Sequence, residues 1–452
     1  MSPRGRAPSA ELARSEYASG LRVITEEMPG TRSVAFAVWV GVGSRDERPS
    51  LAGSSHFLEH LLFKGTTTRT ARQIAEAFDA VGGDLNAFSA KEYTCYYCRV
   101  LDRDVVLAVE LMCDMIQNSV LDRSDFEAER QVILEEIHMH EDDPGDLIHD
   151  LFAETLWKGH PLGRPVLGTK ETISSMDRDQ VRRFYRRHYH PGNFVVAAAG
   201  NVRHEELCGL IEGYMDTGKR LSTGGQPRVR AGGGVPRSSS GVLVTRRKTE
   251  QAHICVGSTA YSRRDPERFA FGVVNSVLGG GMSSRLFQEV REKRGLAYSV
   301  YSYHSMFAET GMFAAYAGTT PSKAEDVLSI IRAELRDIAS GGLTQEELDR
   351  AKGHMKGSLV LSIEDTSGRM SRIGKSEISH GEILSVDEVL RRVDSVTLDD
   401  ARRAAADVFG RPMALAVVGP FGKAAFRGWA DRGAATPDAA VSLAAHSGAA
   451  GT

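Results

Sequence analysis

The feature that most constrains the fold of this 452-residue chain is a linker-like segment near its midpoint, which interrupts the pattern of strands and helices. Residues 217–241 are rich in Gly, Ser, Arg and Pro, a composition typical of a connection between domains. On both sides of it, two strand-like runs are followed by helices, further strands and a closing strand. We therefore expect two tandem homologous α+β domains, each a mainly antiparallel sheet packed with helices, joined by a central linker.

The domain boundaries follow from composition along the chain. Residues 1–17 are expected to form a disordered arm, and the tail 432–452, mostly Ala, Gly, Ser and Thr, is also expected to be disordered. The first domain then covers residues 18–216, and the second covers residues 242–431.

Overall composition limits the partners and the compartment. A net charge of -3 favours neither a nucleic-acid nor an acidic-membrane partner. No apolar run is long enough to span a membrane, and no secretory signal is recognisable, so we expect a cytoplasmic protein. The 5 cysteines are scattered, which favours a reducing compartment. Cys95 and Cys98 lie in a strand-like run and face opposite sides, so we expect core packing for them and no metal site.

One short motif carries the chemistry of the first domain. In His56-Phe57-Leu58-Glu59-His60 the two histidines are four residues apart, so a helix places both imidazoles and the Glu59 carboxylate within one arc. Two neutral nitrogen donors with a nearby carboxylate base suit a zinc hydrolase. Large apolar residues flank the motif, and burying three polar groups among them needs a reason such as a metal.

A third metal ligand must come from elsewhere in the chain. Residues 126–141 form a helical pattern dense in carboxylates, in which Glu129 and Glu136 are seven apart and share a face. Spacing alone does not choose between Glu135 and Glu136. The matching helix of the second half, residues 266–278, contains no histidine, so the metal site is expected on the first half only.

The run from His56 to Thr66, HFLEHLLFKGT, together with ERQVILEEI from Glu129 to Ile137, resembles the pitrilysin, insulysin and mitochondrial processing peptidase family of inverzincin zinc metallopeptidases. The processing-peptidase branch is the most similar, and the resemblance extends from about residue 20 to residue 419. It implies one Zn²⁺ per chain, with Glu136 as the third ligand and Glu129 as the residue that orients a ligand histidine.

The same resemblance implies residues that handle substrate. Arg291 and Tyr298 of the second half would reach the site, where Arg291 holds a substrate carbonyl and Tyr298 stabilises the oxyanion. Residues Asn86, Ala87 and Phe88 would form an exposed edge strand to which an extended peptide adds. Asp146 and Asp150 fall where the processing branch has acidic residues, although they also fit ordinary charges on a helix surface.

Together these observations predict a zinc-dependent endopeptidase that cleaves unfolded peptides or short polypeptides inside a closed chamber, with Glu59 as general base. A homodimer is expected, because the chain carries both the metal half and the Arg291/Tyr298 half. The alternatives are a non-catalytic interaction or scaffold subunit of a processing-peptidase-like complex, and a zinc hydrolase with a non-peptide substrate.

Overall fold

The expected duplication is visible in the order of the strands. A computed structural model of the chain describes residues 11–215, 230 and 234–430. The strands of the first half are β1 (Glu11–Glu16), β2 (Arg22–Glu27), β3 (Ser33–Val40), β4 (Asp84–Ser89), β5 (Thr94–Leu101) and β6 (Phe194–Gly200). Those of the second half are β7 (Val242–Arg246), β8 (Ala252–Ala260), β9 (Ala297–Met306), β10 (Gly311–Thr319) and β11 (Ala414–Gly419).

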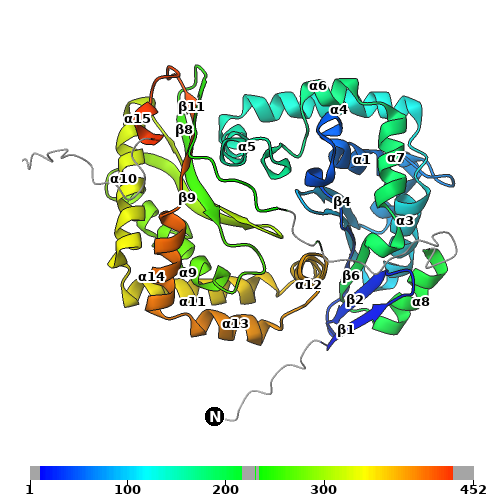
Figure 1. The fold of residues 1–452 in the computed structure, drawn as a ribbon. Helices are drawn as coiled ribbons and strands as arrows, with labels where there is room; N and C mark the ends of the chain where they lie inside the picture. The colour runs from blue at the N-terminus through cyan, green and yellow to red at the C-terminus, as the bar shows by residue number, and fades with distance from the viewer. Residues whose placement is uncertain (1–10, 216–229, 231–233, 431–452) are drawn as a thin grey trace, which may run out of the picture.

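The two sheets have the same topology. Their strand orders are β1-β2-β6-β3-β5-β4 and β7-β11-β8-β10-β9, and the two sheets lie in separate halves of the molecule (Figure 1). In each sheet one pairing is parallel, β2 with β6 and β7 with β11, and the other pairings are antiparallel. With β1 set aside, each strand of the first sheet has an equivalent in the second, which confirms the tandem α+β fold.

Helices cover both faces of each sheet. The first half contributes α1 (Ser54–Leu62), α2 (Ala71–Ala80), α3 (Val105–Asn118), α4 (Arg123–Asp142), α5 (Pro144–Leu156), α6 (Lys170–Ser175), α7 (Arg178–His188) and α8 (His204–Tyr214). The second half contributes α9 (Arg268–Gly279), a π-helical turn (Phe287–Glu292), α10 (Ala324–Asp337), α11 (Gln345–Ser362), α12 (Thr366–His380), α13 (Val386–Ser395), α14 (Leu398–Phe409) and α15 (Arg427–Ala430).

Two of these helices are exchanged between the halves. The apolar face of α5, with Ile148, Phe152 and Leu156, packs on strands β8, β10 and β11 of the second sheet. Helix α12 of the second half packs through Met370 and Ile373 on β2, β3 and β6 of the first sheet. Each sheet is therefore covered on one face by its own helices and on the other by a helix from the partner half, so the halves share their cores.

One boundary differs from the expectation. Residues 1–17 were expected to form a disordered arm, yet 11–16 form strand β1, which pairs antiparallel with β2. The strand has no apolar alternation, and Leu12 is 42% exposed. Its order comes from pairing with β2 and from the ion pair between Arg14 and Glu377 of α12, both of which are tertiary contacts. Residues 1–10 lie outside the described part of the chain.

Further expectations from composition concern the cysteines, the linker, the tail and membrane-spanning helices. Cys95 and Cys98 are buried on opposite faces of the first sheet, in two different apolar clusters, as core packing requires. Most of the expected linker and all of the expected tail, residues 432–452, lie outside the described residues. Within the described chain, no helix combines the length and the apolar character needed to cross a membrane.

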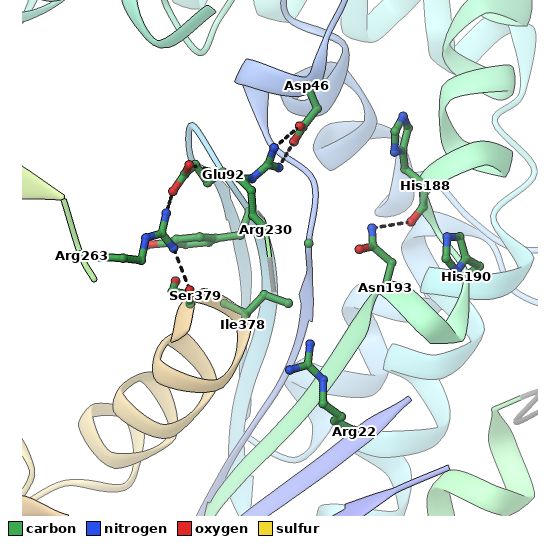
Figure 2. Close-up of a pocket in the computed structure, with 12 residues that line it drawn as sticks. Arg22, Asp46, Glu92, His188, His190, Asn193, Arg230, Arg263, Ile378 and Ser379 are labelled. Atoms are coloured by element: carbon green, nitrogen blue, oxygen red, sulfur yellow. Dashed lines mark hydrogen bonds and ion pairs between the residues drawn. The ribbon is translucent and has the colours of Figure 1, made fainter. Parts of the chain in front are cut away.

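The halves also meet at crossed, buried ion pairs. Arg45 of the first half bonds to Glu309 in the β9–β10 turn, and Arg263 of the second half bonds to Glu92 in the β4–β5 turn. Arg45 and Arg263 follow the equivalent strands β3 and β8, so the duplication places two like pairs across one junction. Figure 2 shows Arg263 reaching Glu92 and Ser379, beside a cavity of about 280 Å³ that none of the expected metal ligands lines.

Candidate active site

The expected metal helix is positioned by its apolar residues. In α1, Phe57, Leu58, Leu61 and Leu62 are fully buried, and the Phe57 ring stacks on Phe126 of α4 with centroids 4.4 Å apart. The helix begins after Gly53, whose φ of 96° is readily adopted by glycine. Packing one face of α1 on α4 turns the polar face of α1 toward the carboxylates of α4.

This packing brings three metal-binding side chains together. The Nε2 atoms of His56 and His60 are 3.3 Å apart, and Glu136 Oε2 lies 3.5 Å from the first and 3.4 Å from the second. Glu135, the alternative that spacing left open, is exposed on another side of α4. Among the described residues, His56, His60 and Glu136 form the one group of three ligand-type side chains within 4.8 Å of one another.

The second layer of contacts shows that these residues fit a metal ion. The Nδ1–H of His60 donates a hydrogen bond to Glu129 Oε2 (3.0 Å), which leaves the lone pair of Nε2 free. When both imidazoles are neutral and carry their proton on Nδ1, three acceptor atoms face one another, and they repel unless a cation lies between them. A set of two histidines and one glutamate matches the ligands of catalytic zinc.

The protonation tendencies of His56 and Glu136 agree with this arrangement, whereas on His60 a proton competes with the metal. Burial, with the nearby charge of His60, lowers the pKa of His56 to about 4, so its imidazole is neutral at neutral pH. Burial also disfavours protonation of His60, but Glu136 and Glu129 outweigh it and raise the pKa of His60. The hydrogen bond from His60 lowers the pKa of Glu136, which keeps this carboxylate ionised.

Glu59 lies beside the metal-binding atoms but does not join them. Ser89, the last residue of β4, is a polar neighbour of Glu59, yet Glu59 Oε2 and the Ser89 hydroxyl are both buried without a hydrogen-bond partner among the described residues. Burial raises the pKa of Glu59, while Ser89 and the charge of His60 oppose the rise. A carboxylate with a raised pKa next to a metal is suited to accept a proton from water.

The residues expected to handle substrate lie in two separate places. Asn86, Ala87 and Phe88 belong to β4, which among the described strands pairs only with β5 and so is the edge of the first sheet, next to α1. Arg291 and Tyr298 lie together in the second half, with the guanidinium of Arg291 4.5 Å from the centre of the Tyr298 ring. Tyr298 is 77% exposed, and the contacts of this pair are local to the second half.

Three further charged residues are Asp146, Asp150 and Lys64. Asp150 pairs with His140 at 3.0 Å, and Asp146 lies in the first turn of α5. The ammonium of Lys64 is 2.6 Å from Glu129 Oε1, so Glu129 bridges Lys64 and His60. Sequence reasoning missed Lys64, although its position one helical turn after His60 places both side chains on the same side of α1.

The fold and this site define the class of protein. Residues 22–170 match the family described as insulinase (peptidase family M16), and residues 175–355 match its peptidase M16 inactive domain, so the chain belongs to this family. The region that matches the inactive-domain description begins within the first half, at residue 175, and contains none of the three metal-binding residues.

Named relatives and solved structures agree. The chain is 53% identical over 411 residues to a protein of Streptomyces coelicolor named an uncharacterized zinc protease, covering 90% of each chain. It is 41% identical to a Bacillus subtilis protein named in the same way, covering 91% of this chain and 99% of the relative. A protease from Helicobacter pylori has a similar fold, with a TM-score of 0.84 and 22% identity over 91% of this chain and 100% of that one.

Proposed function

We propose that this chain is a zinc-dependent endopeptidase that hydrolyses unfolded peptides or short polypeptides. The observation that carries the proposal is the convergence of His56, His60 and Glu136, with Glu59 beside them and a free sheet edge next to the same helix. The names of the relatives, which call them zinc proteases, support the choice of metal and reaction.

The mechanism follows from the chain's own residues. Zinc held by His56, His60 and Glu136 would polarise the scissile carbonyl and acidify the attacking water. Glu59 takes a proton from this water and later delivers it to the leaving amine, while Glu129 keeps the His60 ring in its binding orientation. Tyr298 and Arg291 would stabilise the negative charge that develops on the carbonyl oxygen.

The exposed edge of β4 suggests the form of the substrate. An extended peptide can pair with the backbone of Asn86, Ala87 and Phe88 as an additional strand, which recognises main-chain groups and tolerates many sequences. If the two halves enclose the bound peptide in a chamber, a folded domain cannot reach Glu59. A stable globular protein should therefore be cleaved far more slowly than a short peptide of related sequence.

The test is a quenched-peptide assay combined with zinc analysis, with and without chelator. Glu59→Gln should retain zinc and lose turnover by about 10²- to 10⁴-fold, since only the proton transfer is removed. His56→Ala should lose metal and activity together. Glu135→Gln is the matched control, because Glu135 is exposed next to the metal ligand and should behave as wild type. A Glu59→Gln variant that still cleaves peptides would refute the assigned base, and wild-type protein that binds zinc but cleaves nothing would favour the scaffold alternative.

The exposure of Tyr298 bears on assembly. We propose a homodimer, in which the Arg291/Tyr298 region of one chain faces the zinc of the other, or in which two self-contained clamshells associate. Sedimentation of the active enzyme distinguishes these arrangements from a monomer. An active monomer would exclude the version in which the partner supplies Arg291 and Tyr298.

A further inference from the structure

A buried glutamate lies at the start of the metal-binding helix, at the end opposite to Lys64. Glu47 belongs to the loop before α1 and is 5% exposed. Its Oε2 accepts a hydrogen bond from the backbone N–H of Gly53 (2.7 Å), and its Oε1 accepts one from the N–H of Ser55 (2.6 Å). One carboxylate therefore holds two backbone donors at the first turn of α1, immediately before His56.

The loop that carries Glu47 is itself anchored. The guanidinium of Arg164 donates a hydrogen bond to the backbone carbonyl of Glu47 (2.9 Å). The carbonyl of Arg164 in turn accepts a hydrogen bond from the ammonium of Lys91, which lies in the β4–β5 turn. The carboxylate is thus fixed relative to the edge strand β4 as well as to α1.

Capping a helix does not by itself require a buried carboxylate. A Ser, Thr or Asp at the residue before the helix satisfies the same N–H groups from an exposed position. Burial instead raises the pKa of Glu47 to about 7, even though the N–H groups of Ser55 and Gly53 stabilise its ionised form. The raised pKa means that the ionised side chain is held in the fold at a cost in free energy.

The second half of the chain provides an internal comparison. The loop before α9 carries a carboxylate of its own, Asp265, three residues before that helix begins. Asp265 is only partly buried and accepts a hydrogen bond from the nearby N–H of Glu267 (2.9 Å). In the half without metal ligands, the carboxylate before α9 is therefore partly buried and makes a local contact. In the first half, the Glu47 carboxylate is buried and bonds to the first turn of α1.

We infer that Glu47 is a positioning residue for the metal centre, which fixes the first turn of α1 so that His56 and His60 point toward Glu136. The inference rests on the proposed zinc function. The last turn of α1 is held by Glu129 through His60 and Lys64, so the helix is fixed at both ends. A centre whose imidazoles are held in their binding directions loses less freedom when it takes up zinc.

The test compares the zinc affinity of folded variants by competition with a chromophoric chelator. Glu47→Gln should weaken zinc binding about 10- to 100-fold, because the amide offers only one acceptor to the two N–H groups. It should lower kcat with little change in KM for a quenched peptide. In the metal-free protein, hydrogen exchange at Gly53 and Ser55 should become faster.

The matched control is Glu26→Gln, another buried glutamate, which pairs with Arg369 and Arg372 of α12 and has no contact with α1. It should lower thermal stability and leave zinc affinity unchanged.

The outcomes separate this inference from the proposed function. A folded Glu47→Gln variant with the zinc affinity and exchange rates of wild type would overturn the inference while the proposed function stands. Wild-type protein that binds no zinc would overturn both. Glu47→Asp retains the negative charge but has a shorter side chain. If Glu47→Gln does not fold, this variant tests the positioning role in its place. Its zinc affinity should be reduced, and an affinity equal to wild type would also overturn the positioning role.

Discussion

Single residues at this site differ in how far sequence spacing determines them. His56, Glu59 and His60 follow from spacing along one helix, because the helical repeat alone places them on one face. Glu136 could be separated from Glu135 only by the resemblance to known peptidases or by the direction in which α4 presents its carboxylates. Lys64 contacts Glu129, and its spacing from His60 is a local signal for this contact. Glu47 contacts the first turn of α1, and no local sequence pattern indicates that contact.

The buried Glu47 also predicts a pH dependence of stability. Its pKa is about 7 in the fold and about 4.5 in the unfolded chain, so folding favours the protonated form. Its contribution to stability is complete below pH 4.5 and is lost as the pH rises through 7. For metal-free protein, the unfolding free energy of wild type relative to Glu47→Gln should fall by roughly 3 kcal/mol over this interval. Urea titrations at several pH values measure it, and a difference independent of pH would contradict the prediction.

At the scale of elements, the exchange of α5 and α12 is the feature that holds the two halves together. Periodicity predicts that both segments are helices, but it does not indicate which sheet they cover. Both helices pack through apolar side chains on apolar sheet faces, so apolar character alone does not assign a helix to a sheet. On α12, Gly374 allows the closest approach, since a Cβ atom there would lie 2.1 Å from the indole Nε1 of Trp39 in β3.

This close approach gives a stability prediction. Gly374→Ala should destabilise the protein by about 1–3 kcal/mol or more, because α12 would have to move away from β3. Gly357→Ala is the control: this residue is also in a helix, but a Cβ atom there has nothing within 4 Å, so alanine should stabilise by about 0.5–1 kcal/mol through helix propensity. Chemical unfolding of both variants decides, and a neutral Gly374→Ala would show that the contact is loosely packed.

At the scale of the whole molecule, the duplication places like charges so that they cross the junction. Arg45 and Arg263 follow the equivalent strands β3 and β8, and each pairs with a glutamate from a turn of the opposite half. All four side chains are 4% to 8% exposed, so water does not screen these pairs. The relative position of the halves, and with it the distance between the metal ligands and Tyr298, depends on this junction and on the exchanged helices.

The buried ion pairs at the junction predict that removing one of their charges strongly lowers the free energy of unfolding. Arg45 also pairs with Glu92 of its own half, so Glu309→Gln leaves the two buried guanidinium groups of Arg45 and Arg263 on one carboxylate. The excess buried positive charge should cost about 3–5 kcal/mol of stability. Glu76→Gln removes the partner of Arg72 in an exposed pair and should change stability by less than about 0.5 kcal/mol. Thermal and urea unfolding measure both, and equal effects would contradict the role of the junction.

The sequence by itself determined the duplicated α+β plan, the helix that carries His56, Glu59 and His60, and the presence of the metal site in one half. These depend on periodicity and spacing over short stretches, which the backbone geometry of helices and strands fixes locally. Only the tertiary structure decided the order of β1, the exchange of α5 with α12, the crossed ion pairs, and the contacts of Lys64 and Glu47. The exchanged helices and the crossed ion pairs join residues far apart in the chain, whereas β1 and Glu47 contact residues closer in sequence. The free energy that selects all of these contacts comes from packing and buried charges in the assembled halves.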